Sequence, residues 1–111
     1  MIFKVLIPLY KDEVSPRFDL SVEALIVHYE KKVRKEEKTI VLQRASSEDL
    51  CYLILVEKID IVICGGIEDE YYQYLKWKKV EVIDSVAGTV QKILLEFENN
   101  SLKSGSITFN N

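Results

Sequence analysis

Three segments of the chain are apolar over the length of a β-strand, at residues 2–9, 60–64 and 80–84. The first two are each interrupted by one charged residue, Lys4 or Asp60, and the third by Glu81 and Asp84. Apolar residues at consecutive positions, as in all three, are typical of strands that are buried on both faces. Segments with a helical pattern separate the second strand from its neighbours. Strands that are buried on both faces and joined through helices are expected to be parallel, so the pattern predicts an α/β fold.

The first predicted helix begins after Ser46, which forms a capping box with Asp49 and precedes an apolar run too long for one strand. Apolar residues of that run cover most of the circumference of the predicted helix. This predicts deep burial of Leu50, Leu53, Ile54 and Val56.

The second predicted helix, residues 68–79, begins with acids and ends with lysines around Trp77, which complements a helix dipole. We expect it to turn Ile67, Tyr71, Tyr74 and Leu75 toward the sheet and to leave Tyr72 exposed. The third, residues 89–100, has apolar residues at i, i+3, i+4 and i+7, namely Val90, Ile93, Leu94 and Phe97.

Residues 10–21 have no period and contain Ser-Pro, which predicts a loop. Residues 23–30 and the segment from about 34 to 43 are predicted to form a β-hairpin. The order βββαβαβα then fits a mixed five-stranded sheet of order 3-2-1-4-5 with helices on both faces, the ribonuclease H-like arrangement. We expect residues 1–111 to form one such domain.

The composition excludes several functional classes. A net charge of −3, and a basic run at residues 30–38 that its own glutamates nearly balance, argue against nucleic-acid binding. The N-terminal segment resembles neither a signal peptide nor a membrane span, so we expect a cytoplasmic protein. Cys51 and Cys64 are then expected to be reduced thiols. With a single histidine and no CxxC pair, a zinc site built from this chain is disfavoured.

Candidate site residues lie where predicted strands end. Ligands in open α/β sheets bind beyond the carboxyl ends of the parallel strands, where residues 8–18, 64–67 and 84–89 should meet. Two of these segments lead into helix N-termini, whose free amides suit an anion. Gly65 and Gly66 indicate either a tight turn or a ligand cradle. Cys64 is either a small core residue or a soft ligand whose pKa the next helix lowers.

Other chemically capable residues are predicted mainly to have structural roles. Arg17 is either a solvated side chain or an anion contact at the mouth of the site. Cys51 is expected in the core, and His28 on a half-buried or exposed strand position without other ligands beside it.

The stretches "VSPRFDLS", "IDIVICGGIED", "VEVIDSVAGTVQKILLEF" and "NNSLKSG" resemble the dinitrogenase iron–molybdenum cofactor biosynthesis family over nearly the whole chain. The resemblance implies the ribonuclease H-like fold and binding of a metal–sulfur cluster or an iron–molybdenum cofactor precursor. The residues it points to, with Cys64 as the metal ligand, are Ser15, Pro16, Arg17, Phe18, Cys64, Gly65, Gly66, Gly88 and Thr89. Many relatives have histidine where this chain has Arg17, and this chain also lacks the usual glycine at the hairpin tip.

The resemblance implies a non-catalytic carrier that exchanges its cluster with donor or acceptor proteins. The alternative is a protein-interaction or regulatory module that has kept the fold and lost the cluster site. The change to Arg17 and the tyrosines of the second helix favour the alternative. A nuclease is disfavoured, because two-metal chemistry needs carboxylates gathered on adjacent strands and the first strand has none.

Overall fold

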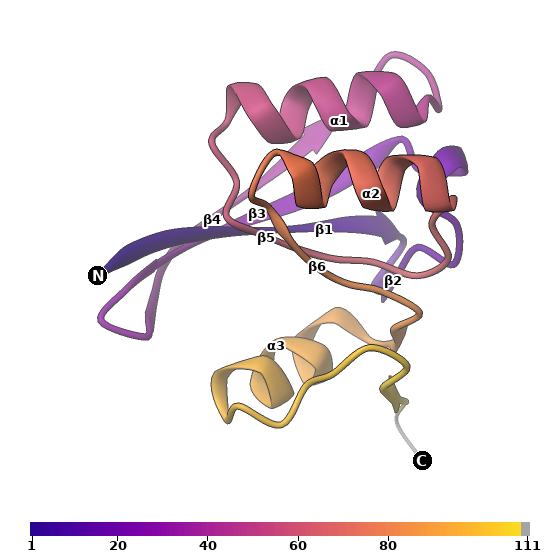
Figure 1. The fold of residues 1–111 in the computed structure, drawn as a ribbon. Helices are drawn as coiled ribbons and strands as arrows, with labels where there is room; N and C mark the ends of the chain where they lie inside the picture. Colours follow the sequence, from indigo (N-terminus) through magenta and orange to yellow (C-terminus); the bar gives the residue numbers. More distant parts are fainter. Residues whose placement is uncertain (110–111) are drawn as a thin grey trace.

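The computed structural model describes residues 1–109 and shows one central sheet with helices above and below it (Figure 1). The last two residues of the predicted domain, 110 and 111, lie outside the described part. The central strand is β1 (Ile2–Tyr10). It pairs in antiparallel fashion with β3 (Glu23–Glu30) and in parallel with β5 (Ile61–Ile63).

The predicted strand order is confirmed. The sheet runs β4-β3-β1-β5-β6, where β4 is Val33–Val41 and β6 is Glu81–Ile83. The strands β3 and β4 form the predicted hairpin, and β5 pairs in parallel with β6. Continuous apolar sequence predicted this correctly because the central residues of β1 are buried on both faces.

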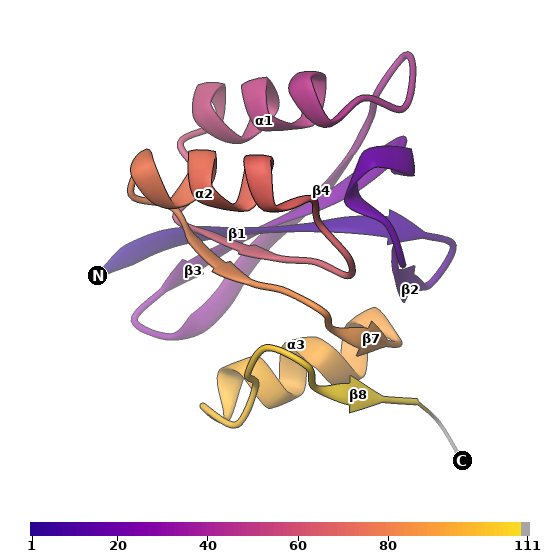
Figure 2. The ribbon, with the colours of Figure 1, turned by 45° about the vertical axis from the view of Figure 1, so that its right-hand side comes forward.

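Two helices cover one face of the sheet and one covers the other (Figure 2). The helices α1 (Ser47–Val56) and α2 (Asp69–Trp77) share a core with one face of the central strands. The helix α3 (Val90–Glu98) packs on the opposite face. One half of the predicted capping box is confirmed, since the Asp49 amide donates to the Ser46 hydroxyl at 3.1 Å, whereas the Asp49 carboxylate pairs with Arg44. No helix among residues 1–109 has the length and apolarity needed to cross a membrane.

Two helix-face predictions were partly wrong. Leu50 and Ile54 of α1 are fully buried, but Val56 is 55% exposed because the helix ends there. On α2, Leu75 is buried as predicted, whereas Tyr74 is 37% exposed and Tyr72 packs on the core.

Part of the predicted loop at residues 10–21 is regular structure. The strand β2 (Glu13–Val14) folds back onto the end of β1, and a 3₁₀ turn, η1 (Phe18–Leu20), follows it. A small second sheet joins β7 (Ala87–Gly88) to β8 (Ile107–Thr108) in parallel. These short elements draw the loops at the carboxyl end of the sheet together.

Candidate functional site at the carboxyl end of the sheet

The loop at residues 15–18, which we call the proline loop, lies directly against the turn that follows β5. The Gly66 amide donates to the Pro16 carbonyl oxygen, and the Phe18 amide donates to the Gly66 carbonyl oxygen, both at 2.8 Å. A Cβ atom on Gly65 would lie only 2.5 Å from the Ser15 carbonyl oxygen. The glycine pair therefore accommodates the backbone of the proline loop, a reason for Gly-Gly that differs from both a ligand cradle and a simple turn.

The third predicted segment also reaches this end of the sheet. The Ser85 amide donates to the Gly65 carbonyl oxygen at 3.0 Å, which links the turns after β5 and β6. Thr89 forms an isolated antiparallel bridge with Glu13. Gly88 has another neighbour, because a Cβ atom there would lie 1.9 Å from the Thr108 carbonyl oxygen in β8. The three segments thus meet, and we call residues 15–18, 64–66 and 85–89 together the rim.

Cys64 contributes no accessible sulfur to the rim. Its side chain is fully buried in the core beneath α1 and α2. Burial, with a smaller contribution from the negative charge of Asp84, raises the pKa of the thiol to about 12. Of the two alternatives for Cys64, the small core residue is confirmed, and the lowered pKa that the neighbouring helix N-terminus suggested is wrong. Cys51 is buried as predicted, and burial raises the pKa of its thiol to about 11. Both cysteines are free.

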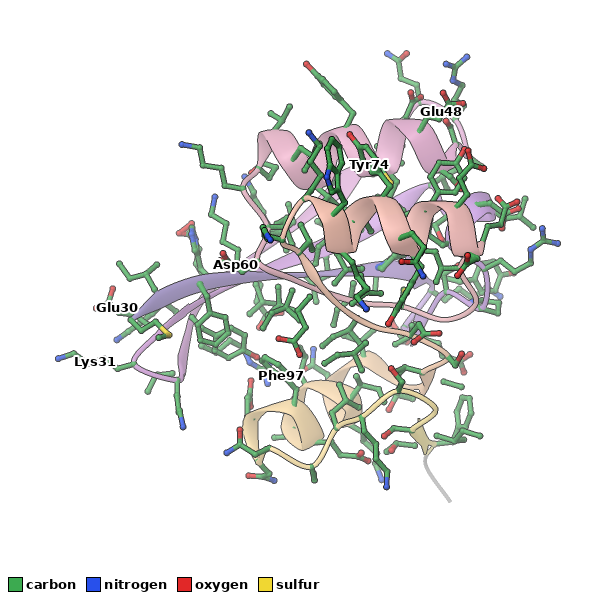
Figure 3. All side chains as sticks on the ribbon, in the orientation of Figure 1. Glu30, Lys31, Glu48, Asp60, Tyr74 and Phe97 are labelled. Carbon is green, nitrogen blue, oxygen red and sulfur yellow. The ribbon has the colours of Figure 1, made fainter. Side chains whose placement is uncertain are left out.

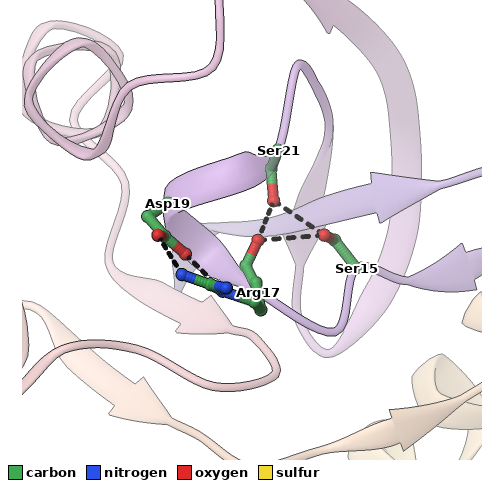
Figure 4. Close-up of polar contacts among 4 residues, drawn as sticks. All are labelled: Ser15, Arg17, Asp19 and Ser21. Atoms are coloured by element: carbon green, nitrogen blue, oxygen red, sulfur yellow. Dashed lines mark hydrogen bonds and ion pairs between the residues drawn. The ribbon is translucent and has the colours of Figure 1, made fainter.

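Arg17 is exposed but already paired. Its guanidinium contacts the Asp19 carboxylate through two nitrogens, at 2.6 and 3.0 Å, and its side chain is 62% exposed (Figure 4). The hydrogen bond and the charge of Asp19 raise the pKa of Arg17, and the same hydrogen bond lowers the pKa of Asp19 despite some desolvation. An anion at the rim would have to compete with Asp19 for this cation.

Two buried hydroxyls fix the backbone of the proline loop. The Ser21 hydroxyl lies 2.7 Å from the Arg17 carbonyl oxygen and 2.8 Å from the Ser15 hydroxyl (Figure 4). The Ser15 hydroxyl also donates to the Arg17 carbonyl oxygen, at 3.1 Å. Sequence reasoning singled out Ser15 but missed Ser21. The serines hold the loop in the shape that seats it on Gly65.

The donor set of the rim does not fit a cluster ligated by side chains of this chain. Cluster irons need thiolate or imidazole ligands, and Cys64 offers a buried neutral thiol. No group of three or more histidine, cysteine, aspartate or glutamate side chains that could hold a metal ion occurs within residues 1–109. His28 lies on β3 between its strand partners Lys4 and Glu36, away from the rim.

Two surface features outside the rim were not recognised from the sequence. A groove of about 340 Å³ lies between α1 and α2, and Tyr52, Tyr71 and Tyr74 help to line it. At the opposite end of β1, the rings of Phe3, Tyr29 and Phe97 pack together. Both combine residues from different elements, so no local sequence pattern indicates them.

Comparison with known proteins agrees with the fold and places the chain in a family. No curated protein matches it. The solved structure of PH0822 superposes with a TM-score of 0.85 at 24% identity, covering 92% of this chain and 94% of that one. The solved structure of the Methanocaldococcus jannaschii protein MJ0327, described as a dinitrogenase, superposes with a TM-score of 0.76 at 26% identity, covering 93% of this chain and 94% of that one. The solved structure of the Thermotoga protein TM1290, described as a NifB protein, superposes with a TM-score of 0.73 at 19% identity, covering 92% of each chain.

The sequence model described as "Dinitrogenase iron-molybdenum cofactor" matches residues 1–100 of the 111. The match spans every strand of the central sheet, all three helices and all the residues of the rim. This chain therefore belongs to the dinitrogenase iron–molybdenum cofactor family.

Proposed function

We propose that this chain is a non-catalytic, cytoplasmic member of the family that works through protein contacts, without holding a cluster of its own. Its partners would be proteins that donate or accept the iron–molybdenum cofactor or a related metal–sulfur cluster. One observation carries the proposal: the only cysteine in the rim is fully buried, with its pKa raised to about 12. Such a thiol is a poor ligand.

The surface best suited to a protein partner lies on α1 and α2. Tyr52 and Trp77 each leave 71% of their surface exposed, and Tyr74 leaves 37%. Large aromatic side chains are enriched at protein interfaces, where they bury much area at little entropic cost. The groove between the helices has Glu48 at one side and Tyr74 at the other (Figure 3). The exposed aromatics and this groove therefore form a surface that a partner could cover.

Anaerobic reconstitution tests the absence of a cluster. The purified protein is incubated with ferrous iron and sulfide, desalted, and measured by visible absorption and iron analysis. We expect a colourless product without bound iron, both for the wild type and for Cys64→Ala. A coloured, iron-loaded wild type whose colour is lost in Cys64→Ala would overturn the proposal.

Site-specific photo-crosslinking tests the contact surface. A photoreactive residue at Tyr52 should trap a protein that mass spectrometry identifies and metal analysis shows to carry a metal–sulfur cluster. The same group at Tyr10, which is also exposed but lies at the end of β1, is the control and should not trap it. Equal trapping at both positions, or trapping only of proteins without clusters, would contradict the proposed surface.

Cluster carriage at the rim is the second candidate, favoured by the meeting of the three predicted segments. It requires the loop at residues 15–18 to leave Gly65 and Gly66, since that loop covers the turn in which Cys64 lies. Arg17 and the rim amides would then face the anionic cargo. The reconstitution experiment separates the two candidates, because only carriage gives iron that depends on Cys64.

A further inference from the structure

A hollow of about 410 Å³ lies between the β3–β4 hairpin tip and the C-terminal end of α3, far from the rim. Three aromatic rings and the side chain of Met1 form its apolar part. Phe3 and Tyr29 stack with centroids 5.0 Å apart and planes 11° apart, and Phe97 meets Tyr29 edge-on at 5.6 Å. Figure 3 shows Phe97 on the side of α3 that faces the sheet, and Lys31 at the hairpin tip. The volume lies within the range of small-molecule sites.

Among the described residues that line the hollow, only Glu98 has a carboxylate, and it is already paired with a cation. Glu98 accepts a hydrogen bond from the Tyr29 hydroxyl at 2.5 Å, and it pairs with the Arg34 guanidinium at 2.8 Å. Burial acts to raise the pKa of Glu98, but the two hydrogen bonds and the Arg34 charge outweigh it and keep the pKa low. Glu98 therefore stays ionised. Because its charge is paired with Arg34, it repels an incoming anion only weakly.

Uncompensated charge on the wall of the hollow is positive. Lys31 and Lys32 both line it, and within residues 1–109 neither forms a salt bridge. Asn100 adds an uncharged amide. A hollow with aromatic walls and two free ammonium groups is complementary to an aromatic ring that carries a negative charge.

The backbone at the two lysines is unusual for the turn that they form. Lys31 and Lys32 link Glu30 to Val33 with φ of 55° and 65°. A two-residue hairpin with both φ positive strongly favours Asn-Gly, because other side chains are strained there. Single lysines at 11, 58 and 79 also have positive φ, so the conformation alone marks no site. Within residues 1–109, the tip is the only place where two such lysines are adjacent, and there both border the aromatic hollow.

We propose that this hollow binds a small planar aromatic carboxylate. The ring lies against the exposed parts of Phe3 and Phe97, and the carboxylate is held by Lys31 and Lys32. The proposal is independent of the function proposed for the rim and for the α1–α2 surface, since it shares no residue with either.

The test uses 2-naphthoate as the probe and the uncharged 2-naphthalenemethanol as its matched control, each titrated by NMR into the labelled protein. We expect naphthoate to shift the amide signals around Phe97 and to bind roughly fivefold or more tightly than the alcohol, as two exposed charge contacts allow. The double variant Lys31→Asn, Lys32→Gly should remove that advantage. It should also raise the midpoint of thermal unfolding by a few degrees, because Asn-Gly suits the turn.

A matched variant separates the effect of the two lysines in the hollow from the effect of removing a surface lysine elsewhere. Lys58→Gly removes a lysine that likewise has positive φ but lies at the end of α1, and it should leave naphthoate binding unchanged. Equal affinity for the acid and the alcohol would overturn the proposal. So would naphthoate affinity within twofold of wild type in the Asn-Gly variant, or amide shifts confined to residues outside the hollow.

Discussion

Replacing Gly65 with alanine tests how firmly the proline loop is seated on the turn after β5. The new Cβ would lie 2.5 Å from the Ser15 carbonyl oxygen and 2.8 Å from that of Pro16. Ordinary contacts of this kind are close to 3.4 Å or longer, so the two backbones must separate by nearly 1 Å. Both neighbours are backbone atoms, which cannot rotate out of the way as a flexible side chain would.

The magnitude follows from what that separation breaks. The hydrogen bonds between Gly66 and Pro16, and between Phe18 and Gly66, are both 2.8 Å long and would be stretched. Each is worth about 1 kcal/mol, and steric overpacking adds roughly 1–3 kcal/mol. We therefore expect Gly65→Ala to lower the free energy of unfolding by roughly 3–5 kcal/mol. Equilibrium urea denaturation, followed by circular dichroism, measures it.

Gly66→Ala is the matched control, since it adds the same methyl group one residue later. Its Cβ would lie 3.3 Å from the Pro16 carbonyl oxygen, a contact that a shift of a few tenths of an ångström relieves. We expect a loss under about 1 kcal/mol. If Gly65→Ala cost no more than Gly66→Ala, the loop would yield easily. The rim could then open, which would favour cluster carriage over the interaction module.

Two further perturbations follow from the structure. In the native protein at pH 8, Cys51 and Cys64 should resist Ellman's reagent, and denaturant should release both thiols. The pKa of Cys64 is raised to about 12 in the folded state, so the folded protein keeps the thiol proton to a higher pH than the unfolded chain does. The free energy of unfolding should therefore fall as pH rises above about 9. In Cys64→Ala this fall should be smaller. Arg34→Met removes the cation from the partly buried Glu98 and should destabilise the protein by roughly 1–3 kcal/mol in urea denaturation, whereas Tyr29→Phe should cost about 1 kcal/mol.

The central sheet was predictable because its determinants are local. An apolar run such as residues 2–9 is recognisable without knowing its neighbours, and the helices between β1, β5 and β6 fix parallel pairing. The spacing of Val90, Ile93 and Leu94 likewise identified the buried face of α3. Both features depend on burial. Burial on two faces leaves a continuous apolar run in the sequence, and burial of one helix face leaves a helical period.

The short pairings at the rim were not predictable in this way. The strands β2, β7 and β8 each have two residues, too few for a period, and backbone hydrogen bonds hold them. Tyr72 and Tyr74 were assigned to the wrong faces, because both positions of α2 lie near the border between core and solvent.

The burial of Cys64 could have been read from strand parity. Side chains two residues apart in a strand share a face, and Val62 and Cys64 indeed lie in the same core, on the side of α1 and α2. Ile63 points into the opposite core. The position of Cys64 at the end of a strand left two alternatives, a core residue or a ligand at the rim, and the alternation favours the core residue.

The same geometry sets a limit on how this chain could bind a cluster. The space beside Gly65 that a ligand would need is filled by the Ser15 and Pro16 backbone, so seating of the loop and occupation by cargo exclude each other. Opening the loop breaks two backbone hydrogen bonds, worth about 2 kcal/mol, and also withdraws the fully buried Phe18 side chain from the core. The apparent affinity of any cargo at Cys64 therefore falls by roughly 30-fold or more. A partner that bound and stabilised the open loop would remove this penalty. Carriage by this chain would therefore depend on a second protein, which is why we place protein contact ahead of cluster ligation.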